Sequence, residues 1–483
     1  MTRPPARLAR LPLAVPAIAL GTAALLLAFS PRYGYHRDEL YFRLLGTRPA
    51  WGYFDTPPLT PLIARASTEV FGDGVTAIRI VPALLVAVTV VLAALIAREL
   101  GGGRGAQILA AAGVATGTIV LIGGHSLVTL GVDLPFWMAA FLFALRAVRR
   151  PGGGRNWVWF GVTAGLATYN RLLIAMLVMA LFAAFLVVGP RAVFRDRWLW
   201  IGGLVALALA APNLVYQATH DWPQTQMASA LREDEGGENR ALFVPMQLVL
   251  LSLLLVPVQV AGFVRLWRSR DVRAFALAYP FAAVLTLASG GRPDYTAYLL
   301  ILLFVAGCVP TAAWMSSRTR KALVGAAVAV GAASAMLTAL PVLPESELDG
   351  SLTAATNEVV RESVGWPSFV RQVSGAAVRT PGAVIVTDNY GEAGALARWK
   401  DEYSLPPIYS RHNELWWWGG PPASTQTVTF VGFGEGLGRF FTRCDTVARI
   451  SGMIGEEDGR AVVVCRGPLQ PWPSFWRTIR SYS

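Results

Sequence analysis

Acidic and aromatic side chains gather just after the first hydrophobic run of this chain. The segment Tyr35–Tyr41 contains Asp38 and Glu39, and the segment Trp51–Leu59 contains Asp55. The chain otherwise avoids charge, with only 15% charged residues. Acidic groups at a membrane face are costly, and where they occur they usually mark a functional site. A carboxylate in such a place can act as a general base that removes a proton from an acceptor hydroxyl.

Each of these acids has a chemical interpretation and a structural alternative. Asp38 is the candidate catalytic base, and the alternative is a carboxylate that caps a helix start. On a helix, Glu39 would point about 100° away from Asp38, which favours a structural or substrate-orienting role. Asp55 comes before Pro57 and Pro58, which stiffen the backbone. We expect Asp55 on a fixed turn, either as a substrate contact or as a turn-forming residue.

The elements that hold these residues are predicted to be membrane helices. Of the 483 residues, 54% are hydrophobic, and a soluble protein would carry about 25% charged residues. Apolar runs of roughly 17–25 residues are typical of helices that span a bilayer. Eleven such runs lie near residues 11–29, 77–97, 106–123, 132–148, 156–169, 172–189, 198–215, 244–264, 274–289, 295–313 and 322–341.

Basic residues predict which ends of these runs face the cytoplasm. The net charge of +12 is mostly arginine, and it does not argue for nucleic acid, because the arginines gather in loops at alternate ends of the runs. Such loops face the cytoplasm. They are the loops that hold Arg3, Arg7 and Arg10; Arg98 and Arg104; Arg146, Arg149, Arg150 and Arg155; Arg191, Arg195 and Arg197; Arg265, Arg268, Arg270 and Arg273; and Arg318, Arg320 and Lys321.

This charge pattern predicts a multi-pass protein of the cell membrane. Its N-terminus is expected in the cytoplasm, and everything after residue 342 is expected outside. The first run also resembles a signal peptide with a small-residue cleavage site, but Pro31 argues against cleavage and favours an uncleaved anchor.

Two further candidates lie on the predicted extracytoplasmic side. Asp133 begins a hydrophobic run there, so it is placed on the same side as Asp38; the helix dipole alone also favours an acid at that position. His125 is expected either to hydrogen-bond a sugar or a phosphate, or to be a satisfied structural histidine.

Two arginines depart from the charge rule and are candidate phosphate ligands. Arg171 and Arg292 each lie in a short turn on the predicted extracytoplasmic side. A guanidinium binds phosphate through two hydrogen bonds, whereas interfacial snorkelling is the alternative. Arg292 is favoured because Asp294 and Tyr295 lie beside it. His36 and Arg37 are further candidates.

No cofactor is predicted with certainty. The segment 216–243 contains His220 and an acidic run at 233–235, which we interpret as a solvated, mobile loop that can close over a site. A divalent cation held by His220 and these acids is the alternative, although no spacing rule supports it.

From about Glu345 the composition becomes that of a soluble fold. Short β-branched runs at 383–387, 428–431 and 461–465 alternate with helical segments, which predicts a small α/β domain over 345–483. Cys444 and Cys465 lie in this domain, where an oxidising compartment would permit a disulfide; two free thiols are the alternative. Trp416–Trp418 are expected to stack on a sugar, to lie at the bilayer interface, or to pack within the protein.

Several motifs taken together resemble one family. They are Asp38-Glu39, the element Phe54–Leu59, Asp133, Pro212–Pro223, Gly291–Tyr295, Asn389–Ala395 and Ser410–Gly420. In this combination the chain resembles the GT-C superfamily of polytopic glycosyltransferases, in particular glycosyltransferase family 39. That family includes protein mannosyltransferases and lipid A aminoarabinose transferases. The resemblance implies a GT-C fold with about eleven transmembrane helices, a transmembrane catalytic domain over 1–344, and the extracytoplasmic α/β domain after it.

The resemblance also implies an activity. An inverting enzyme of this family transfers a sugar from a polyprenyl-phosphate carrier to an extracytoplasmic protein, lipid or cell-envelope glycan, and its base matches Asp38. Glu39, Asp55, Asp133, His125, Arg171, Arg292 and Tyr295 are then candidates for substrate binding. At Thr56 the aminoarabinose transferases are expected to have a lysine, so a lysine contact to phosphate is in doubt here.

A membrane transporter or lipid flippase is the alternative function. Transporters place charged residues near the middle of the membrane and often contain inverted repeats. Here the acids lie in loops and no convincing repeat is visible, which favours the transferase. A non-catalytic membrane scaffold is a third interpretation.

Overall fold

The chain forms two compact units in the computed structural model, which describes residues 10–434 and 436–482. The first unit contains the described residues up to Ser30, with Arg79–Trp222 and Leu231–Val342. The second contains Pro31–Ile78, Pro223–Ala230 and the chain from Leu343 onward. The loop with the candidate base therefore belongs to the same unit as the predicted C-terminal domain. The predicted cytoplasmic residues Arg3 and Arg7 lie outside the described residues.

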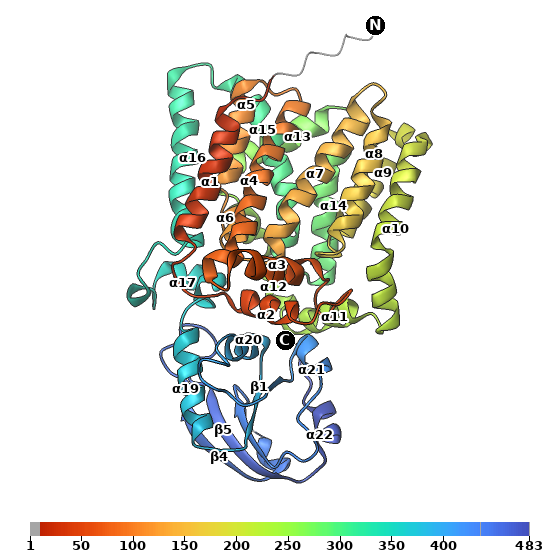
Figure 1. Ribbon diagram of the computed structural model, residues 1–483. Helices are drawn as coiled ribbons and strands as arrows, with labels where there is room; N and C mark the ends of the chain where they lie inside the picture. Colours follow the sequence, from red (N-terminus) through yellow and green to blue (C-terminus); the bar gives the residue numbers. More distant parts are fainter. Residues whose placement is uncertain (1–9, 435, 483) are drawn as a thin grey trace. The chain divides into compact units, whose positions relative to one another are not determined.

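The first unit is a bundle of helices (Figure 1). Its helices are α1 (Ala14–Phe29), α4 (Val75–Glu99), α5 (Arg104–Ala115), α6 (Thr118–His125), α7 (Thr129–Arg149), α8 (Asn156–Ala167), α9 (Ile174–Val188), α10 (Arg197–Thr219), α12 (Gly236–Val249), α13 (Val256–Arg268), α14 (Arg273–Ser289), α15 (Ala297–Trp314) and α16 (Arg318–Ala339). At the centre, α15 is buried from Ala297 to Cys308. It lies close against α13, because a Cβ at Gly307 would be only 1.8 Å from the carbonyl oxygen of Val258. Small residues permit such contact between apolar helices.

The prediction of a multi-pass membrane protein is confirmed, but the count of eleven spans is not. Five helical segments among the described residues are long and apolar enough to cross a bilayer: Val75–Glu99, Thr129–Arg149, Arg197–Thr219, Pro293–Trp314 and Arg318–Ala339. Two bent pairs raise the number to seven. The runs predicted near 11–29, 172–189 and 274–289 form helices of only 15 to 17 residues, and a straight span needs about 20.

The two bent pairs support each other at their breaks. One pair, α5 with α6, bends by 58°, and the other, α12 with Leu253–Arg268, bends by 69°. The amide of Thr118 donates to the carbonyl of Leu251 at 3.1 Å, and that of Ile119 donates to Leu250 at 2.9 Å. Backbone amides at one break thus donate hydrogen bonds to backbone carbonyls at the other, and an apolar environment requires such pairing.

The prediction of a mobile loop over 216–243 is wrong. Helix α11 (Pro223–Asp234) and helix α12 occupy most of it. Proline is favoured at a first helical position, and the residues after Pro223 are mostly good helix formers. The acidic run therefore lies at a helix end.

The second unit is built on a five-stranded sheet. Its strands are β1 (Val384–Thr387), β2 (Ile408–Ser410), β3 (Thr427–Val431), β4 (Phe441–Arg449) and β5 (Ala461–Pro468), in the order β2-β1-β3-β5-β4. Strand β1 is parallel to β2 and β3, and β5 is antiparallel to β3 and β4. This confirms the predicted α/β character. Strands β2 and β4 escaped prediction because β2 has three residues and β4 is largely exposed and polar.

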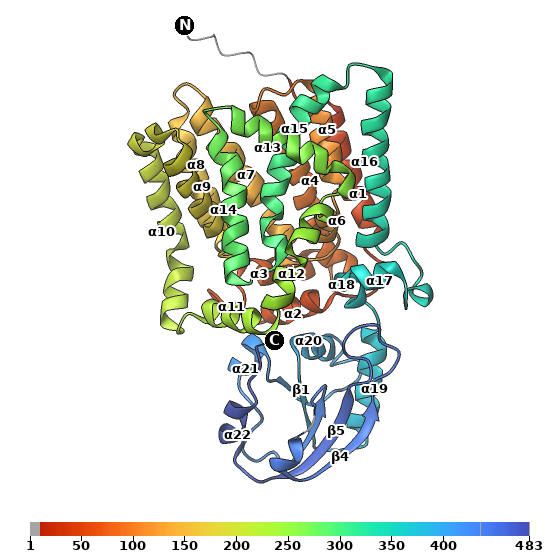
Figure 2. The ribbon, with the colours of Figure 1, turned by 180° about the vertical axis from the view of Figure 1, so that it is seen from behind.

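The second unit also contains helices. They are α2 (Arg37–Gly46), α3 (Leu59–Phe71), α17 (Leu352–Thr356), α18 (Glu358–Arg361), α19 (Trp366–Val378), α20 (Tyr390–Arg398), α21 (Asn413–Trp417) and α22 (Trp472–Thr478). Figure 2 shows α19 and α22 on opposite sides of the sheet. Trp472 and Phe475 of α22 belong to the same buried cluster as Phe430 of β3. The predicted disulfide is confirmed, since Cys444 and Cys465 are directly opposite on β4 and β5 and are bonded.

Two glycines let α20 approach α2. A Cβ at Gly391 would lie 2.8 Å from the Cβ of Arg37, and a Cβ at Gly394 would lie 2.8 Å from the carbonyl carbon of Leu40. Both distances are shorter than real contacts, so neither position has room for a side chain. The motif Asn389–Ala395 thus brings a helix of the C-terminal region against the first-loop helix.

Substitution of Gly394 tests this contact. We expect Gly394→Ala to destabilise the protein by about 1–3 kcal/mol, because overpacking forces the backbones apart. Gly375→Ala is the matched control: Gly375 lies in α19 with open space around it, and alanine there should stabilise the helix by about 0.5–1 kcal/mol. Thermal unfolding in detergent measures both variants. Equal melting temperatures would contradict the close contact.

Candidate active site in the first loop

The start of α2 is fixed by a reciprocal cap, and Asp38 is not its capping carboxylate. His36 is the N-cap residue, and its Nδ1 accepts from the amide of Asp38 at 3.2 Å. Glu39 accepts from the amide of His36 at 2.8 Å and is fully buried. This arrangement is a capping box in which histidine takes the place of serine or threonine. Glu39 is thus tied into the helix start, whereas the Asp38 side chain is half-buried and points elsewhere.

Two tyrosines bind the two first-loop aspartates. The hydroxyl of Tyr390 donates to Oδ1 of Asp38 at 2.8 Å, and the hydroxyl of Tyr41 donates to Oδ1 of Asp55 at 2.7 Å. The two tyrosine rings lie 4.6 Å apart between centroids. Asn413 also donates to Oδ2 of Asp55, at 3.3 Å. The structure therefore brings Asp38 and Asp55 into one polar cluster.

The Asp55 carboxyl has a pKa close to neutral pH. Burial raises the pKa of its carboxyl to about 7; the hydrogen bond from Tyr41 opposes this shift, and the nearby Glu414 carboxylate adds to it. Glu414 accepts from the amide of Phe54 at 2.8 Å, and burial raises its own pKa. Near neutral pH, Asp55 can therefore accept or donate a hydrogen bond.

The basic residues beside Asp38 are engaged by acids of the same unit. Nε2 of His36 lies 2.9 Å from Glu362, and Nε of Arg37 lies 3.0 Å from the same carboxylate. Arg37 also pairs with Glu456 at 2.9 Å. Burial alone would lower the pKa of His36, but Asp38 and the hydrogen bond to Glu362 outweigh burial and raise it. These bases stabilise the acidic cluster.

A second polar cluster lies in the first unit. Asp133, in the second turn of α7, accepts from Asn170 at 2.5 Å and from the hydroxyl of Tyr298 at 3.4 Å. The guanidinium of Arg171 lies 5.1 Å from the ring centroid of Tyr295 and attracts the Asp133 carboxylate. Three predicted residues, Asp133, Arg171 and Tyr295, thus share one cluster.

The other two predicted residues of this unit have different partners. His125 is buried, and its Nε2 lies 3.4 Å from the guanidinium of Arg79. Arg79 also donates to the carbonyl of Ser30 at 2.8 Å. Arg292 is half exposed and lies 3.7 Å from Asp294.

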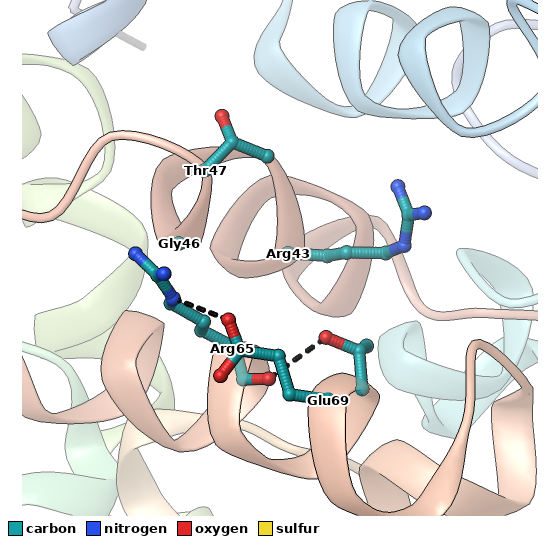
Figure 3. Close-up of a pocket in the computed structure, with 6 residues that line it drawn as sticks. Arg43, Gly46, Thr47, Arg65 and Glu69 are labelled. Atoms are coloured by element: carbon teal, nitrogen blue, oxygen red, sulfur yellow. Dashed lines mark hydrogen bonds and ion pairs between the residues drawn. The ribbon is translucent and has the colours of Figure 1, made fainter.

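One cavity of the second unit lies apart from these residues. It has a volume of about 230 Å³ and is lined by Arg43, Gly46, Thr47, Arg65, Thr68 and Glu69 (Figure 3). Arg65 donates to Glu69 at 2.7 Å, and Arg43 pairs with Asp73. Carboxylates thus neutralise its arginines, and it includes none of the predicted site residues.

Within the described part of the chain, no group of three or more histidine, cysteine, aspartate or glutamate side chains is placed to hold a metal ion. His220 stacks on Tyr216, with 4.1 Å between the ring centroids. Among the described residues, His220 and the acidic run at 233–235 are therefore not part of such a group.

The tryptophan run divides between packing and exposure. Trp416 and Trp476 exchange hydrogen bonds, each indole donating to the other's carbonyl at 2.8 and 3.1 Å. Trp418 donates to Glu414 at 3.2 Å, whereas Trp417 is 51% exposed. Trp416 therefore has the packing role that was one of the alternatives.

Sequence reasoning missed the tyrosines of this cluster. Tyr41 and Tyr390 lie far apart in the chain, and nothing in their spacing pairs them with the aspartates. One local signal was available, since Asn389 and Glu392 have capping-box spacing and form that cap. The spacing places Tyr390 at a helix start but does not reveal its partner.

The raised pKa of Asp55 predicts how stability depends on pH. The folded protein binds this proton more tightly than the unfolded chain, so the contribution is present at acidic pH and is lost as pH rises from 3.8 through about 7. Between those limits we expect the melting temperature of the wild type to fall more steeply than that of Asp55→Asn. The exposed Asp401→Asn should follow the wild type. Parallel curves for wild type and Asp55→Asn, recorded by thermal unfolding, would refute the assignment.

Comparisons with known proteins agree with this architecture. Residues 55–216 match the family of dolichyl-phosphate-mannose-protein mannosyltransferases. ArnT from Cupriavidus metallidurans in the apo state is 15% identical with a TM-score of 0.59, over 93% of this chain and 96% of that chain. The same protein bound to undecaprenyl phosphate is 16% identical, with the same TM-score and coverage. No curated protein sequence matches the chain.

A larger enzyme shares the fold as well. Arabinofuranosyltransferase AftD from Mycobacteria is 13% identical with a TM-score of 0.51, over 94% of this chain and 40% of that chain. At such low identity the likeness concerns the fold. Together, these matches confirm the resemblance predicted from the sequence: the chain has the fold of the GT-C glycosyltransferases, and its residues 55–216 carry the pattern of the mannosyltransferase family.

Proposed function

We propose that this protein is an inverting membrane glycosyltransferase that moves a sugar from a polyprenyl-phosphate carrier to an extracytoplasmic acceptor. The observation that carries the proposal is Asp38, a half-buried carboxylate at the head of α2 whose Oδ1 accepts a hydrogen bond from the hydroxyl of Tyr390. The matched family and the fold shared with ArnT, which has been solved with undecaprenyl phosphate bound, indicate the donor class.

The chemistry follows from a single displacement. Asp38 accepts the proton of the acceptor hydroxyl as its oxygen attacks the anomeric carbon. The bond from that carbon to the phosphate oxygen breaks, and the polyprenyl phosphate leaves with the bonding electrons. Attack opposite the leaving group inverts the anomeric centre. A positioned general base contributes roughly 10²–10⁴-fold to such a rate.

The leaving phosphate needs a cation. We assign this role to Arg171 and Arg292, with Tyr295 and Asp133 beside Arg171 to orient it. A guanidinium matches phosphate geometry and keeps its charge. Asp55, with its pKa near 7, is assigned to a hydrogen bond with a sugar or acceptor hydroxyl. Glu39 supports Asp38 by holding the start of α2 through the helix cap. His125 is assigned to a hydrogen bond with the sugar or the phosphate of the donor.

The orientation in the membrane is part of the proposal. The alternating basic loops predict that the N-terminus lies in the cytoplasm and residues 345–483 outside. The bond between Cys444 and Cys465 supports this side, because disulfides persist in oxidising compartments. The acceptor would then be a protein, lipid or cell-envelope glycan.

Substitution of Asp38 tests the activity. Purified protein in lipid vesicles is offered each candidate polyprenyl-phosphate sugar with an envelope extract, and release of the polyprenyl phosphate is followed. We expect Asp38→Asn to lower kcat by roughly 10²–10⁴-fold. The exposed Asp401→Asn should retain wild-type turnover. Equal turnover by Asp38→Asn would remove Asp38 from the mechanism.

Reporter fusions test the orientation. Alkaline phosphatase, which needs disulfides, should be active when fused after Ser483. Green fluorescent protein fused at the same position should not fluoresce. The reverse pattern would place the C-terminal region in the cytoplasm and exclude the proposed site of transfer.

A further inference from the structure

We infer that Tyr390 is a positioning residue for Asp38, so that the C-terminal region completes the reaction centre. The inference rests on the proposed function and assigns a role in it to a residue more than 300 positions after the base. The hydroxyl of Tyr390 donates to Oδ1 of Asp38 at 2.8 Å. One carboxylate oxygen is thereby fixed, which orients the other.

The backbone around Tyr390 is rigid. Tyr390 is the first residue of α20, directly after the N-cap Asn389. Asn389 and Glu392 form a reciprocal cap, with the amide of Glu392 donating to the Asn389 side chain at 2.8 Å. The close approach at Gly391 and Gly394 then sets the distance from α20 to α2.

The ring of Tyr390 is enclosed on its faces and edge. The Tyr41 ring lies 4.6 Å away and the His412 ring 5.0 Å away, both measured between centroids. The Arg37 guanidinium lies 5.5 Å from the ring centroid, and the backbone amide of Tyr390 donates to Nδ1 of His412 at 3.1 Å. The ring therefore has little freedom to turn its hydroxyl away from Asp38.

The direction of the hydrogen bond suits a base. Burial raises the pKa of the Tyr390 phenol well above its ordinary value, so the hydroxyl keeps its proton and can only donate to Asp38. Asp38 is therefore the acceptor of this bond, as a base must be. Burial also lowers the pKa of His412 to about 3, so the stacked imidazole adds no positive charge.

A purely packing role for Tyr390 makes different predictions. Tyr390→Phe keeps the ring and its stacking but removes the hydroxyl. If Tyr390 positions Asp38, kcat should fall about 10- to 100-fold, as expected for loss of a hydrogen bond to a charged group, while KM stays nearly unchanged. If the ring only packs, neither value should change.

Other charged groups of this cluster also bear on the comparison of Tyr390→Phe with the wild type. The titratable and charged side chains that face Asp38 or Tyr390 are His36, Arg37, Asp55, Glu362, His412 and Glu456. All of them are retained in Tyr390→Phe, so a difference between variant and wild type reports the missing hydroxyl.

The experiment compares wild type, Tyr390→Phe and Tyr409→Phe in the full-length protein in lipid nanodiscs. Tyr409 is a half-buried tyrosine on β2 of the same unit, outside the cluster, and serves as the control. The sugar-transfer assay gives kcat and KM against pH. In the Asp38→Asn background, Tyr390→Phe should cause no further loss, because the two residues act through one hydrogen bond.

A second measurement does not depend on turnover. The rate at which a water-soluble carbodiimide labels Asp38 at a fixed pH is measured by mass spectrometry. We expect labelling to be faster in Tyr390→Phe, because Oδ1 of Asp38 then no longer accepts the hydroxyl of Tyr390, and to be unchanged in Tyr409→Phe. An unchanged rate in Tyr390→Phe would overturn the inference. A faster rate in a protein that transfers no sugar from any donor would support the positioning of Asp38 and refute the proposed function.

Discussion

The packing of α2 against α20 is the constraint on which the candidate site depends. Helix α2 carries Asp38, and α20 carries the tyrosine that holds it. The two helices meet at backbone distance only because Gly391 and Gly394 have no side chains. The first loop and the C-terminal region consequently act as one structural unit, although more than 300 residues separate α2 from α20 in the sequence.

The sequence was sufficient to predict the features that depend on residues close together in the chain. Apolar runs, the charge shift near Glu345 and the β-branched run at 383–387 predicted the membrane helices, the C-terminal α/β fold and strand β1. The motif around Asp38 also led to a family whose fold the chain shares. Helix lengths were harder to predict, because α5 and α12 end within apolar stretches, and hydropathy alone does not register a bend.

The polar clusters were only partly predictable. Asp133, Arg171 and Tyr295 were each named as candidates from the sequence, Arg171 because it departs from the charge rule, and the fold brings them together. The pairing of Tyr390 with Asp38 and of Tyr41 with Asp55 could not be predicted in this way. These contacts depend on the angle and distance between helices, which one sequence without an alignment does not encode in any local pattern.

The paired breaks in the helical unit have a consequence for how the protein is made. The amide groups of Thr118 and Ile119 find their partners at Leu251 and Leu250, more than a hundred residues later. While the ribosome is still producing the intervening helices, the first bend has no such partners. Its final geometry can therefore form only after the second bent pair has entered the membrane. Until then, the insertion machinery or trapped water must satisfy these backbone groups, so this step of biogenesis waits on a distant part of the chain.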